Sequence, residues 1–419
     1  MLDSYVPGNP RSDVRSMTAE PQTTIKLPET QPITDAHRKR GLFFVGAAVA
    51  AVGCAMAIQL ATNSNFVADE IGISAEQQGL LEAIRESCGV IALAVLALLA
   101  GLAEPLIGAA MLVLLAVGLG SYIFVPDYAW LIVASLVWSQ GIHVWFPLPD
   151  SMTLALAEPG KAGKRLGQIH AAWAAGFGGA LVVAYLLRVV GGVQIRPLYV
   201  LAGAAGLLGA GLCLGIPRTI KTARPRFVFR RKYWLYYLLC FLEGWRKQIF
   251  VAFAGYLLVK HYGAPLETML GLWVIIQAIS YVAAPLVGRL IDRTGERPVL
   301  VFYFACLTAF FVGYAFIKSK SALYAIYVID SAFFVFAIAL KTYVNRIAPK
   351  SEHTATLSMG VAVNHVSAVL MPIVGGLLWR LAGPEWTFLI GAFAAAASIG
   401  PALFLPGRPQ RHPIADERR

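Results

Sequence analysis

Several ionisable residues lie inside long apolar stretches of the sequence, where charged side chains are rare. One stretch carries Glu82, Arg85 and Glu86 at positions i, i+3 and i+4, and a later one carries Glu243, Arg246 and Lys247 at the same spacing. Side chains spaced in this way project from one face of a helix. Because an ionisable group in an apolar environment is costly, each trio should face the protein interior or a water-filled cavity. The trios are therefore candidate sites for binding a charged solute or a proton.

Each trio contains its own counter-charge, which leaves two interpretations open. The charges could neutralise one another and fix the packing of their helices. Alternatively, after one pairing the first trio retains a carboxylate and the second a cation, which could bind a substrate anion. We favour Arg246 as that cation because a guanidinium can hold a carboxylate through two hydrogen bonds, and Arg85 is a second predicted substrate contact. The acids Glu82, Glu86 and Glu243 are predicted to take part in proton coupling.

Asp330 stands alone in the apolar sequence Tyr-Val-Ile-Asp-Ser-Ala-Phe-Phe, with no counter-charge within one helical turn. A lone carboxylate in such surroundings is costly to keep ionised, which suits a carrier of protons. A salt bridge from another helix, given by Arg85 or Arg246, is an equally weighted alternative. Asp330 is therefore the main single-residue candidate for proton coupling.

Three histidines, at positions 143, 170 and 365, also fall within apolar stretches that are far apart in the sequence. We predict that His143 and His365 contact substrate, although a lone histidine is more often structural. Gln277 and Asn364 are further predicted substrate contacts, with hydrogen bonding between helices as the alternative role. The Cys, His and acidic residues show no spacing typical of metal ligands, so we predict neither a metal site nor a cofactor.

The composition is that of a membrane protein. The 419 residues are 58% hydrophobic and 14% charged, with a mean hydropathy of +0.66. One helix needs about 20 apolar residues to cross the hydrocarbon, and the long unbroken apolar runs exclude an outer-membrane barrel. The sequence predicts spans near 41–62, 77–102, 106–125, 129–152, 166–190, 197–217, 233–259, 267–287, 299–317, 322–345, 357–381 and 386–405. We therefore expect an all-α protein with twelve transmembrane helices.

The basic residues predict the domain organisation and the orientation. Lys and Arg gather in both tails and in the loops near 161–165, 218–232, 289–297 and 346–350, all on one side of the predicted membrane. This bias places both termini in the cytoplasm of a bacterial-type inner (plasma) membrane. It also accounts for the net charge of +12 without a nucleic-acid partner. We predict a disordered tail (1–40), a six-helix bundle (41–217), a basic linker (218–232), a second bundle (233–405) and a C-terminal tail (406–419).

One predicted cytoplasmic loop carries a recognisable motif. Its sequence Gly-Arg-Leu-Ile-Asp-Arg-Thr-Gly-Glu-Arg-Pro, residues 288–298, resembles the signature G-x-L-x-D-R-x-G-x-R of the major facilitator superfamily. The resemblance implies two pseudo-symmetric six-helix bundles that rock around one central site. It also implies a conformational latch. In that latch Gly288 permits close approach of helices, Asp292 accepts hydrogen bonds from a helix N-terminus, and Arg293 and Arg297 pair with carboxylates, with Gly295 completing the motif.

The first half carries a degenerate copy of this motif. Gly101 and Gly108 repeat the seven-residue spacing of the motif glycines, but Pro105 stands where the acid is expected. Glycine pairs at 178–179 and 375–376 give a second sign of duplication. The third, sixth, ninth and twelfth spans have no ionisable residue, as the resemblance implies for helices that face lipid and not the cavity.

The leading hypothesis for function is a secondary transporter, not an enzyme. We expect alternating access to move a small polar solute, anionic or zwitterionic, with protons as the coupling ion, through a monomer in the lipid bilayer. Two alternatives remain open. One is efflux of drugs or siderophore-like metabolites by antiport, and the other is a receptor or scaffold that has a transporter fold but moves nothing.

Overall fold

The computed structural model describes residues 34–222 and 229–407. Most of the predicted N-terminal tail, the middle of the predicted linker and nearly all of the predicted C-terminal tail lie outside these ranges. The first helix begins at Asp35, because the Thr34 side chain caps it by accepting a hydrogen bond from the His37 backbone N–H at 3.3 Å. The prediction of a disordered tail up to residue 40 was therefore wrong for residues 35–40, which are helical.

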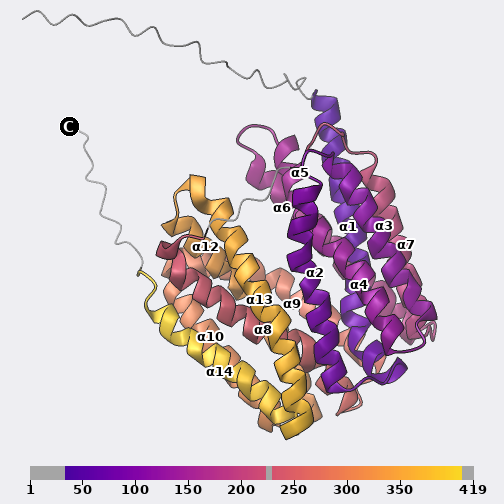
Figure 1. The fold of residues 1–419 in the computed structure, drawn as a ribbon, viewed down its shortest axis with the longest axis vertical. Coiled ribbons are helices and arrows are strands. Elements are labelled where there is room, and N and C mark those ends of the chain that lie inside the picture. Colours follow the sequence, from indigo (N-terminus) through magenta and orange to yellow (C-terminus); the bar gives the residue numbers. More distant parts are fainter. Residues whose placement is uncertain (1–33, 223–228, 408–419) are drawn as a thin grey trace, which may run out of the picture. The chain divides into compact units, whose positions relative to one another are not determined.

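The described residues form helices throughout (Figure 1). The first half contains α1 (Asp35–Asn65), the π-helical turn η1 (Phe66–Glu70), α2 (Ala75–Leu98), α3 (Glu104–Gly120), η2 (Ser121–Phe124), α4 (Tyr128–Trp145), α5 (Leu148–Leu156), α6 (Ala162–Val189) and α7 (Ile195–Cys213). The second half contains η3 (Arg231–Tyr233), α8 (Trp234–Lys260), α9 (Leu266–Thr294), α10 (Glu296–Phe316), α11 (Lys320–Phe333), η4 (Phe334–Ala337), α12 (Ile338–Ile347), α13 (Lys350–Ala382) and α14 (Pro384–Leu403).

Ten of these segments are long and apolar enough to cross a membrane within the described residues. Two of the ten are interrupted helices: α4 and α5 form one span broken near Pro147, and α11, η4 and α12 form another broken by a 3-10 turn. The helices α2 and α8 also have the length to cross, with 24 and 27 residues, but they carry the charged trios. This arrangement is consistent with the twelve predicted spans.

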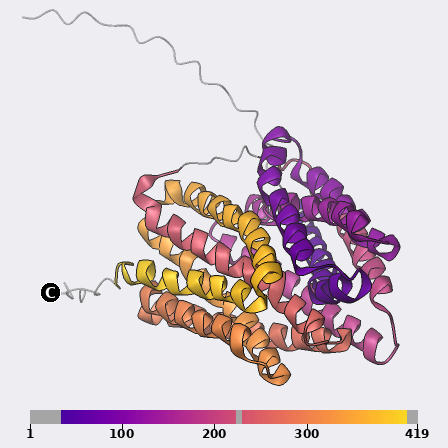
Figure 2. The ribbon, with the colours of Figure 1, turned by 60° about the horizontal axis from the view of Figure 1, so that its bottom comes forward.

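The helices pack as two halves, which contact each other through a few pairs of helices (Figures 1 and 2). In the first half α1 packs on α6 and α7, and α3 packs on α4 and α7. In the second half α8 packs on α13 and α14, and α10 packs on α14. The halves meet mainly where α2 crosses α13 and α6 crosses α9. The all-α membrane fold expected from the sequence is confirmed.

Two glycines allow the backbones of α2 and α13 to touch. A Cβ atom on Gly79 would lie 2.1 Å from the carbonyl oxygen of Pro372, and one on Gly376 would lie 2.8 Å from that of Ala75. Small residues at helix crossings allow such close contact between helices in membranes. The α2–α13 crossing is therefore tight in this conformation.

Polar contacts between the halves gather at one end of the helices, which we call the far end. It holds residues 65–74, 189–195, 260–266 and 383, and the opposite end, where α7 ends and α8 begins, is the linker end. The cross-half contacts at the far end include Asn65 Nδ2 to the Ala264 carbonyl (3.0 Å), Tyr256 Oη to the Ile73 carbonyl (2.7 Å), Arg188 to Glu267 (3.2 Å) and Arg380 to Glu76 (3.2 Å). These contacts hold the far end closed.

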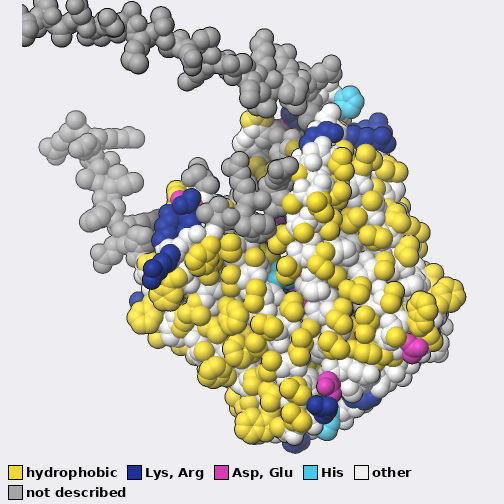
Figure 3. Space-filling view, viewed as in Figure 1, with side chains coloured by type: hydrophobic (Ala, Val, Ile, Leu, Met, Phe, Trp, Pro, Cys, Tyr) yellow, Lys and Arg dark blue, Asp and Glu magenta, His cyan; other side chains and the backbone are white. Residues whose placement is uncertain are grey.

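The outer surface matches a lipid environment. In the face shown in Figure 3, hydrophobic side chains cover the middle, and the Lys and Arg side chains lie near its ends. The described ends of the predicted linker contact each half. Ala103 and Lys221 form an isolated antiparallel bridge, and Lys232 Nζ lies 2.8 Å from a carboxylate oxygen of Glu352. Hydrogen bonds from Lys232 and Tyr233 lower the pKa of the Glu352 carboxyl, so the carboxylate that contacts Lys232 is ionised at neutral pH.

The structure corrects the register of the predicted motif copy. Gly101 precedes α3 with a φ of 89°, and Gly295 precedes α10 with a φ of 85°. Both turns need a left-handed residue, which favours glycine. Gly288 instead lies inside α9, and a Cβ there would meet nothing within 4 Å. The structural counterpart of Gly101 is therefore Gly295 and not Gly288, and Gly288 makes no close helix contact in this conformation.

Candidate functional site

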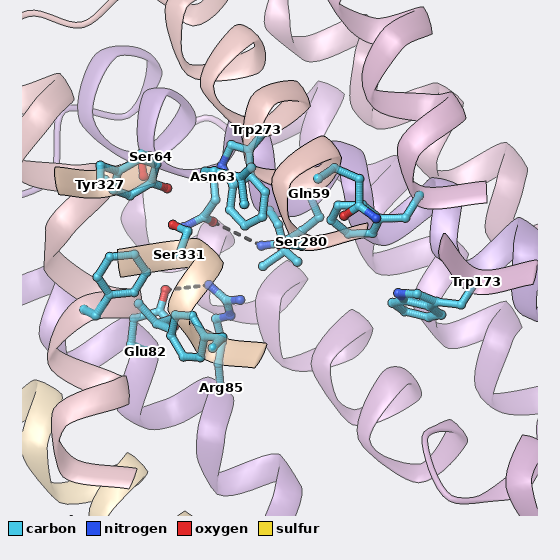
Figure 4. Close-up of a pocket in the computed structure, with 18 residues that line it drawn as sticks. Gln59, Asn63, Ser64, Glu82, Arg85, Trp173, Trp273, Ser280, Tyr327 and Ser331 are labelled. Atoms are coloured by element: carbon cyan, nitrogen blue, oxygen red, sulfur yellow. Dashed lines mark hydrogen bonds and ion pairs between the residues drawn. The ribbon is translucent and has the colours of Figure 1, made fainter. Parts of the chain in front are cut away.

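A cavity of about 340 Å³ lies between the two halves (Figure 4). Its walls come from α1, α2 and α6 of the first half and from α8, α9, α11 and η4 of the second. Neither α3 and α7 nor α10 and α14 contribute a lining residue, as predicted for the four spans without charges. This volume lies within the usual range for small-molecule sites.

Aromatic and uncharged polar side chains dominate the lining. Figure 4 shows Trp173 at one side of the cavity and Tyr327 at the other, with Trp273 between them. The aromatic lining residues are Trp173, Phe177, Phe250, Trp273, Tyr327 and Phe334, and the amides and hydroxyls are Gln59, Asn63, Ser64, Gln277, Ser280 and Ser331. Gln59 Nε2 donates to Asn63 Oδ1 at 3.3 Å, while Gln59 Oε1 is buried without a partner. The cavity can thus stack a flat ring and hydrogen-bond polar groups.

The charged residues that line the cavity neutralise each other. Arg85 Nη1 donates to Glu82 Oε1 at 2.6 Å, and both side chains are buried. The Arg85 guanidinium also lies 4.5 Å from the centre of the Trp138 ring, a cation–π contact. Gln78 Nε2 donates to Glu82 and to the Ala252 carbonyl of the other half. In this conformation the pair presents no net charge to a solute.

A second buried cluster lies within the second half, beside the cavity. Arg246 pairs with Glu243 at 2.5 Å, and Arg246 Nη1 lies 3.5 Å from Asp330 Oδ1. Arg246 also donates to Tyr303 Oη at 2.7 Å, and that hydroxyl donates to Glu243 at 3.0 Å. Arg246 and Asp330 have no exposed surface. The side chain predicted to bind a substrate anion therefore lies away from the cavity wall, held by two carboxylates.

The pair between Arg246 and Asp330 is one of the two salt bridges that we gave above as the alternative role of Asp330. Two carboxylates nevertheless share one guanidinium, so the cluster carries a charge of −1 when both acids are ionised. Of the two, Asp330 is held less well, because neither of its oxygens makes a hydrogen bond. Binding one proton would make the cluster neutral.

The structure also brings together three predicted residues from three different helices. Glu86 on α2, His143 on α4 and His365 on α13 each place a possible ligand atom within 4.8 Å of the others. His365 Nδ1 lies 3.2 Å from Glu86 Oε2, and the two histidine rings are 5.7 Å apart. The sequence could not predict this group, because its members are 57 and 222 residues apart along the chain.

Other predicted substrate contacts have separate positions. Arg85 and Gln277 line the cavity, whereas Asn364 accepts a hydrogen bond from Lys247 and donates to the Cys240 carbonyl. These bonds match the helix-joining role that we left open for Asn364. His170 lies 3.4 Å from Asp150 on exposed surface.

Most of the polar residues that line the cavity were not predicted from the sequence. Gln59 and Asn63 are four residues apart on α1, so they share one helix face within an apolar span. That spacing could have predicted a polar helix face that lines a cavity. The hydroxyls of Ser64, Ser280 and Ser331 gave none, because serine is common on helix faces in membranes.

The motif residues lie at the linker end. Asp292, Arg293 and Arg297 are exposed, and no hydrogen bond of Asp292 is found among the described residues. Gly295 ends α9 and begins α10. Among the described residues, the hydrogen bond predicted between Asp292 and a helix N-terminus is not present in this conformation.

Residues 236–419 match the sequence model of the Major Facilitator Superfamily. No curated protein sequence matches the chain significantly. Among solved structures, the nucleoside transporter NupG has 15% sequence identity and a TM-score of 0.71, over 86% of this chain and 98% of that one. The D-xylose-proton symporter has 14% sequence identity and a TM-score of 0.65, over 88% of this chain and 98% of that one. An inward-facing bacterial homologue of the human lysosomal transporter Spinster has 12% sequence identity and a TM-score of 0.62, over 88% of this chain and 94% of that one. At these identities the likenesses show the fold alone, and the family match covers only the second half of the chain.

Proposed function

We propose that the chain is a transporter of the Major Facilitator Superfamily and that it carries a small, uncharged polar solute with a flat ring, of the nucleoside type, across the membrane together with protons. The observation that supports this proposal is the lining of the central cavity. Six aromatic side chains and six amide or hydroxyl side chains surround it, and its one acid and one base are paired with each other.

The charge balance favours a neutral solute over the anionic or zwitterionic one predicted from the sequence. An anion would need a free cation in the cavity, but Arg85 is held by Glu82 and Arg246 is buried with two acids. A neutral solute with a planar ring can instead stack on Trp173 or Trp273. The names of NupG and of the xylose symporter describe transport of a nucleoside and of a sugar, both uncharged and rich in hydroxyls.

Alternating access follows from the distribution of contacts between the halves. The cross-half contacts at the far end would have to break, and new contacts form at the linker end, for the cavity to change sides. Asp292 is exposed here, so its carboxylate could accept hydrogen bonds from a helix N-terminus when the linker end closes in that second state. If the termini lie in the cytoplasm, as the basic loops predict, the cavity of this structure would face inward.

Proton coupling is assigned to the cluster of Arg246, Glu243 and Asp330. Its excess carboxylate is fully buried, so protonation removes a costly charge from the interior. Asp330 is followed directly by Ser331, which lines the cavity. The proton and the solute would therefore bind on the same turn of α11.

The test is uptake by the purified full-length protein in liposomes with an imposed proton gradient. We expect accumulation of labelled uridine or xylose and none of uridine monophosphate, which differs from uridine by its charge. The Trp273→Ala variant should lose binding, and Trp234→Ala, a change at an exposed tryptophan, should keep it. Uptake of the nucleotide alone would contradict the proposal.

Two further outcomes would support the alternatives. Saturable binding of a solute without any flux would favour a receptor or scaffold. Proton-driven transport restricted to bulky organic cations would favour drug efflux.

A further inference from the structure

Glu86, His143 and His365 form a group that the proposed transport cycle does not use. Their nearest nitrogen and oxygen atoms lie within 4.8 Å of one another, and none of the three lines the central cavity described above. The Glu86 and His365 side chains are each 17% exposed, so the group is sheltered but open to water. Two imidazoles and one carboxylate are the ligand set of many three-residue zinc sites.

The hydrogen bonds of the histidines leave nitrogen atoms available for a ligand. His143 Nδ1 lies 2.8 Å from the Ser139 carbonyl, to which it can donate, and this bond leaves Nε2 with a free lone pair. Metal-binding histidines are commonly oriented in this way by a backbone carbonyl. His365 Nδ1 is buried and has no hydrogen-bond partner, although Glu86 Oε2 is 3.2 Å away.

We propose that Glu86, His143 and His365 bind a divalent transition metal ion, with Zn²⁺ as the reference. In a tetrahedral zinc site the ligand atoms lie roughly 3.4 Å apart, given metal–ligand bonds of about 2.0–2.1 Å. Metal binding would therefore require the ligand atoms, which now lie within 4.8 Å of one another, to move closer together by rotation of their side chains. The fourth position would hold water, because the group supplies three ligands.

The metal would bind one conformation of the transporter. Glu86 and His143 belong to the first half and His365 to the second, so the three ligands come together only while α2 and α13 cross as they do here. A ligand that binds one state shifts the population toward it. Zn²⁺ is therefore expected to hold the halves in this conformation and to slow transport.

The group has a competing explanation in which Glu86 and His365 form only an ion pair. That pair would also join the halves, but it would give no saturable metal binding. The two explanations therefore differ in a measurement that does not depend on transport.

The experiment is a titration of the purified, metal-free, untagged full-length protein with Zn²⁺ by calorimetry, and with Co²⁺ by visible absorption. We expect one ion per chain and the intense absorption of tetrahedral Co²⁺. His143→Ala and His365→Ala should each weaken binding at least about 10-fold. The matched control is His353→Ala, because His353 contacts the Ala348 carbonyl at the linker end and lies outside the group.

A conservative variant distinguishes loss of metal binding from loss of folding. Glu86→Gln keeps the side-chain volume and should weaken binding while the protein elutes as a single species in detergent. The proposal is overturned if His143→Ala and His365→Ala bind Zn²⁺ as the wild type does, or if the wild type shows no saturable binding. It is also overturned if the His353→Ala control loses binding to the same degree.

Discussion

We expect Asp330→Asn to abolish proton-driven accumulation of substrate and to leave counterflow exchange intact. Accumulation requires a group that binds and releases a proton in each cycle, whereas exchange requires only that the loaded carrier reorients. Asp330 is the less well held of the two acids that share Arg246. Its neutral analogue fixes the cluster in the form that a bound proton would give.

The same substitution should change the free energy of unfolding by only about 2 kcal/mol or less, because two terms oppose each other. The attraction between charges 3.5 Å apart is about 5 kcal/mol at an effective dielectric constant of 20. Removing the Asp330 charge also removes the desolvation cost of a buried carboxylate, which is several kcal/mol, and its repulsion from Glu243. Arg246 keeps its closer partner, so no buried cation is left unpaired.

A second variant of the same cluster provides the contrast. Arg246→Met leaves two buried carboxylates without a cation, and we expect it to cost about 3–5 kcal/mol. Asp150→Asn is the matched control, because Asp150 is half-exposed and lies outside the cluster. Unfolding in detergent by denaturant, followed by tryptophan fluorescence, would compare the three variants, and accumulation and counterflow would be measured in liposomes.

The reasoning is refuted by either of two results. Full accumulation by Asp330→Asn at normal expression would show that another group carries the proton, with Glu243 the next candidate. A loss of stability equal to that of Arg246→Met would show that Asp330 is a structural partner of Arg246 that the fold requires.

Three further outcomes follow from the described contacts. Asp292→Asn should slow transport several-fold while substrate binding and expression stay normal, because the carboxylate acts only when the linker end closes; unchanged flux would contradict the latch. Gly79→Val should weaken the α2–α13 crossing and reduce transport, measured against Gly163→Val, where a Cβ meets nothing within 4 Å. Cysteines placed at Leu208 and Phe393, which are about 60% exposed on α7 and α14, should resist water-soluble thiol reagents because they face lipid; strong labelling at both would show that these helices face water.

The spans could be predicted from the sequence because a crossing has a simple physical requirement, about 20 consecutive apolar residues. Their ends could not. The helix α1 begins at Asp35, before the apolar stretch, because a capping side chain and not hydropathy sets its start. The charged helix α8 is an exception, because its ends were predicted near 233 and 259 and lie at Trp234 and Lys260.

The site was predictable where its contacts are local. The spacing of three residues places Glu82 beside Arg85 and Glu243 beside Arg246, and both pairs are formed. The partner of Asp330 was not determined by sequence, because Arg246 lies on another helix and only packing brings the two together. The same limit hid Tyr303, whose hydroxyl bridges the Glu243–Arg246 pair.

The two charged pairs differ in a way that separates binding from coupling. The pair that faces the cavity is balanced, whereas the buried cluster in the second half has one carboxylate too many. The helix α11 connects the two regions, because Asp330 belongs to the cluster and the next residue, Ser331, lines the cavity. Phe334 begins the 3-10 turn that interrupts this span, lies 4.8 Å below the Arg246 guanidinium and also lines the cavity. We therefore propose that a change of charge at Asp330 would act directly on the break in this helix beside the cavity, which would give a physical route from proton binding to substrate binding.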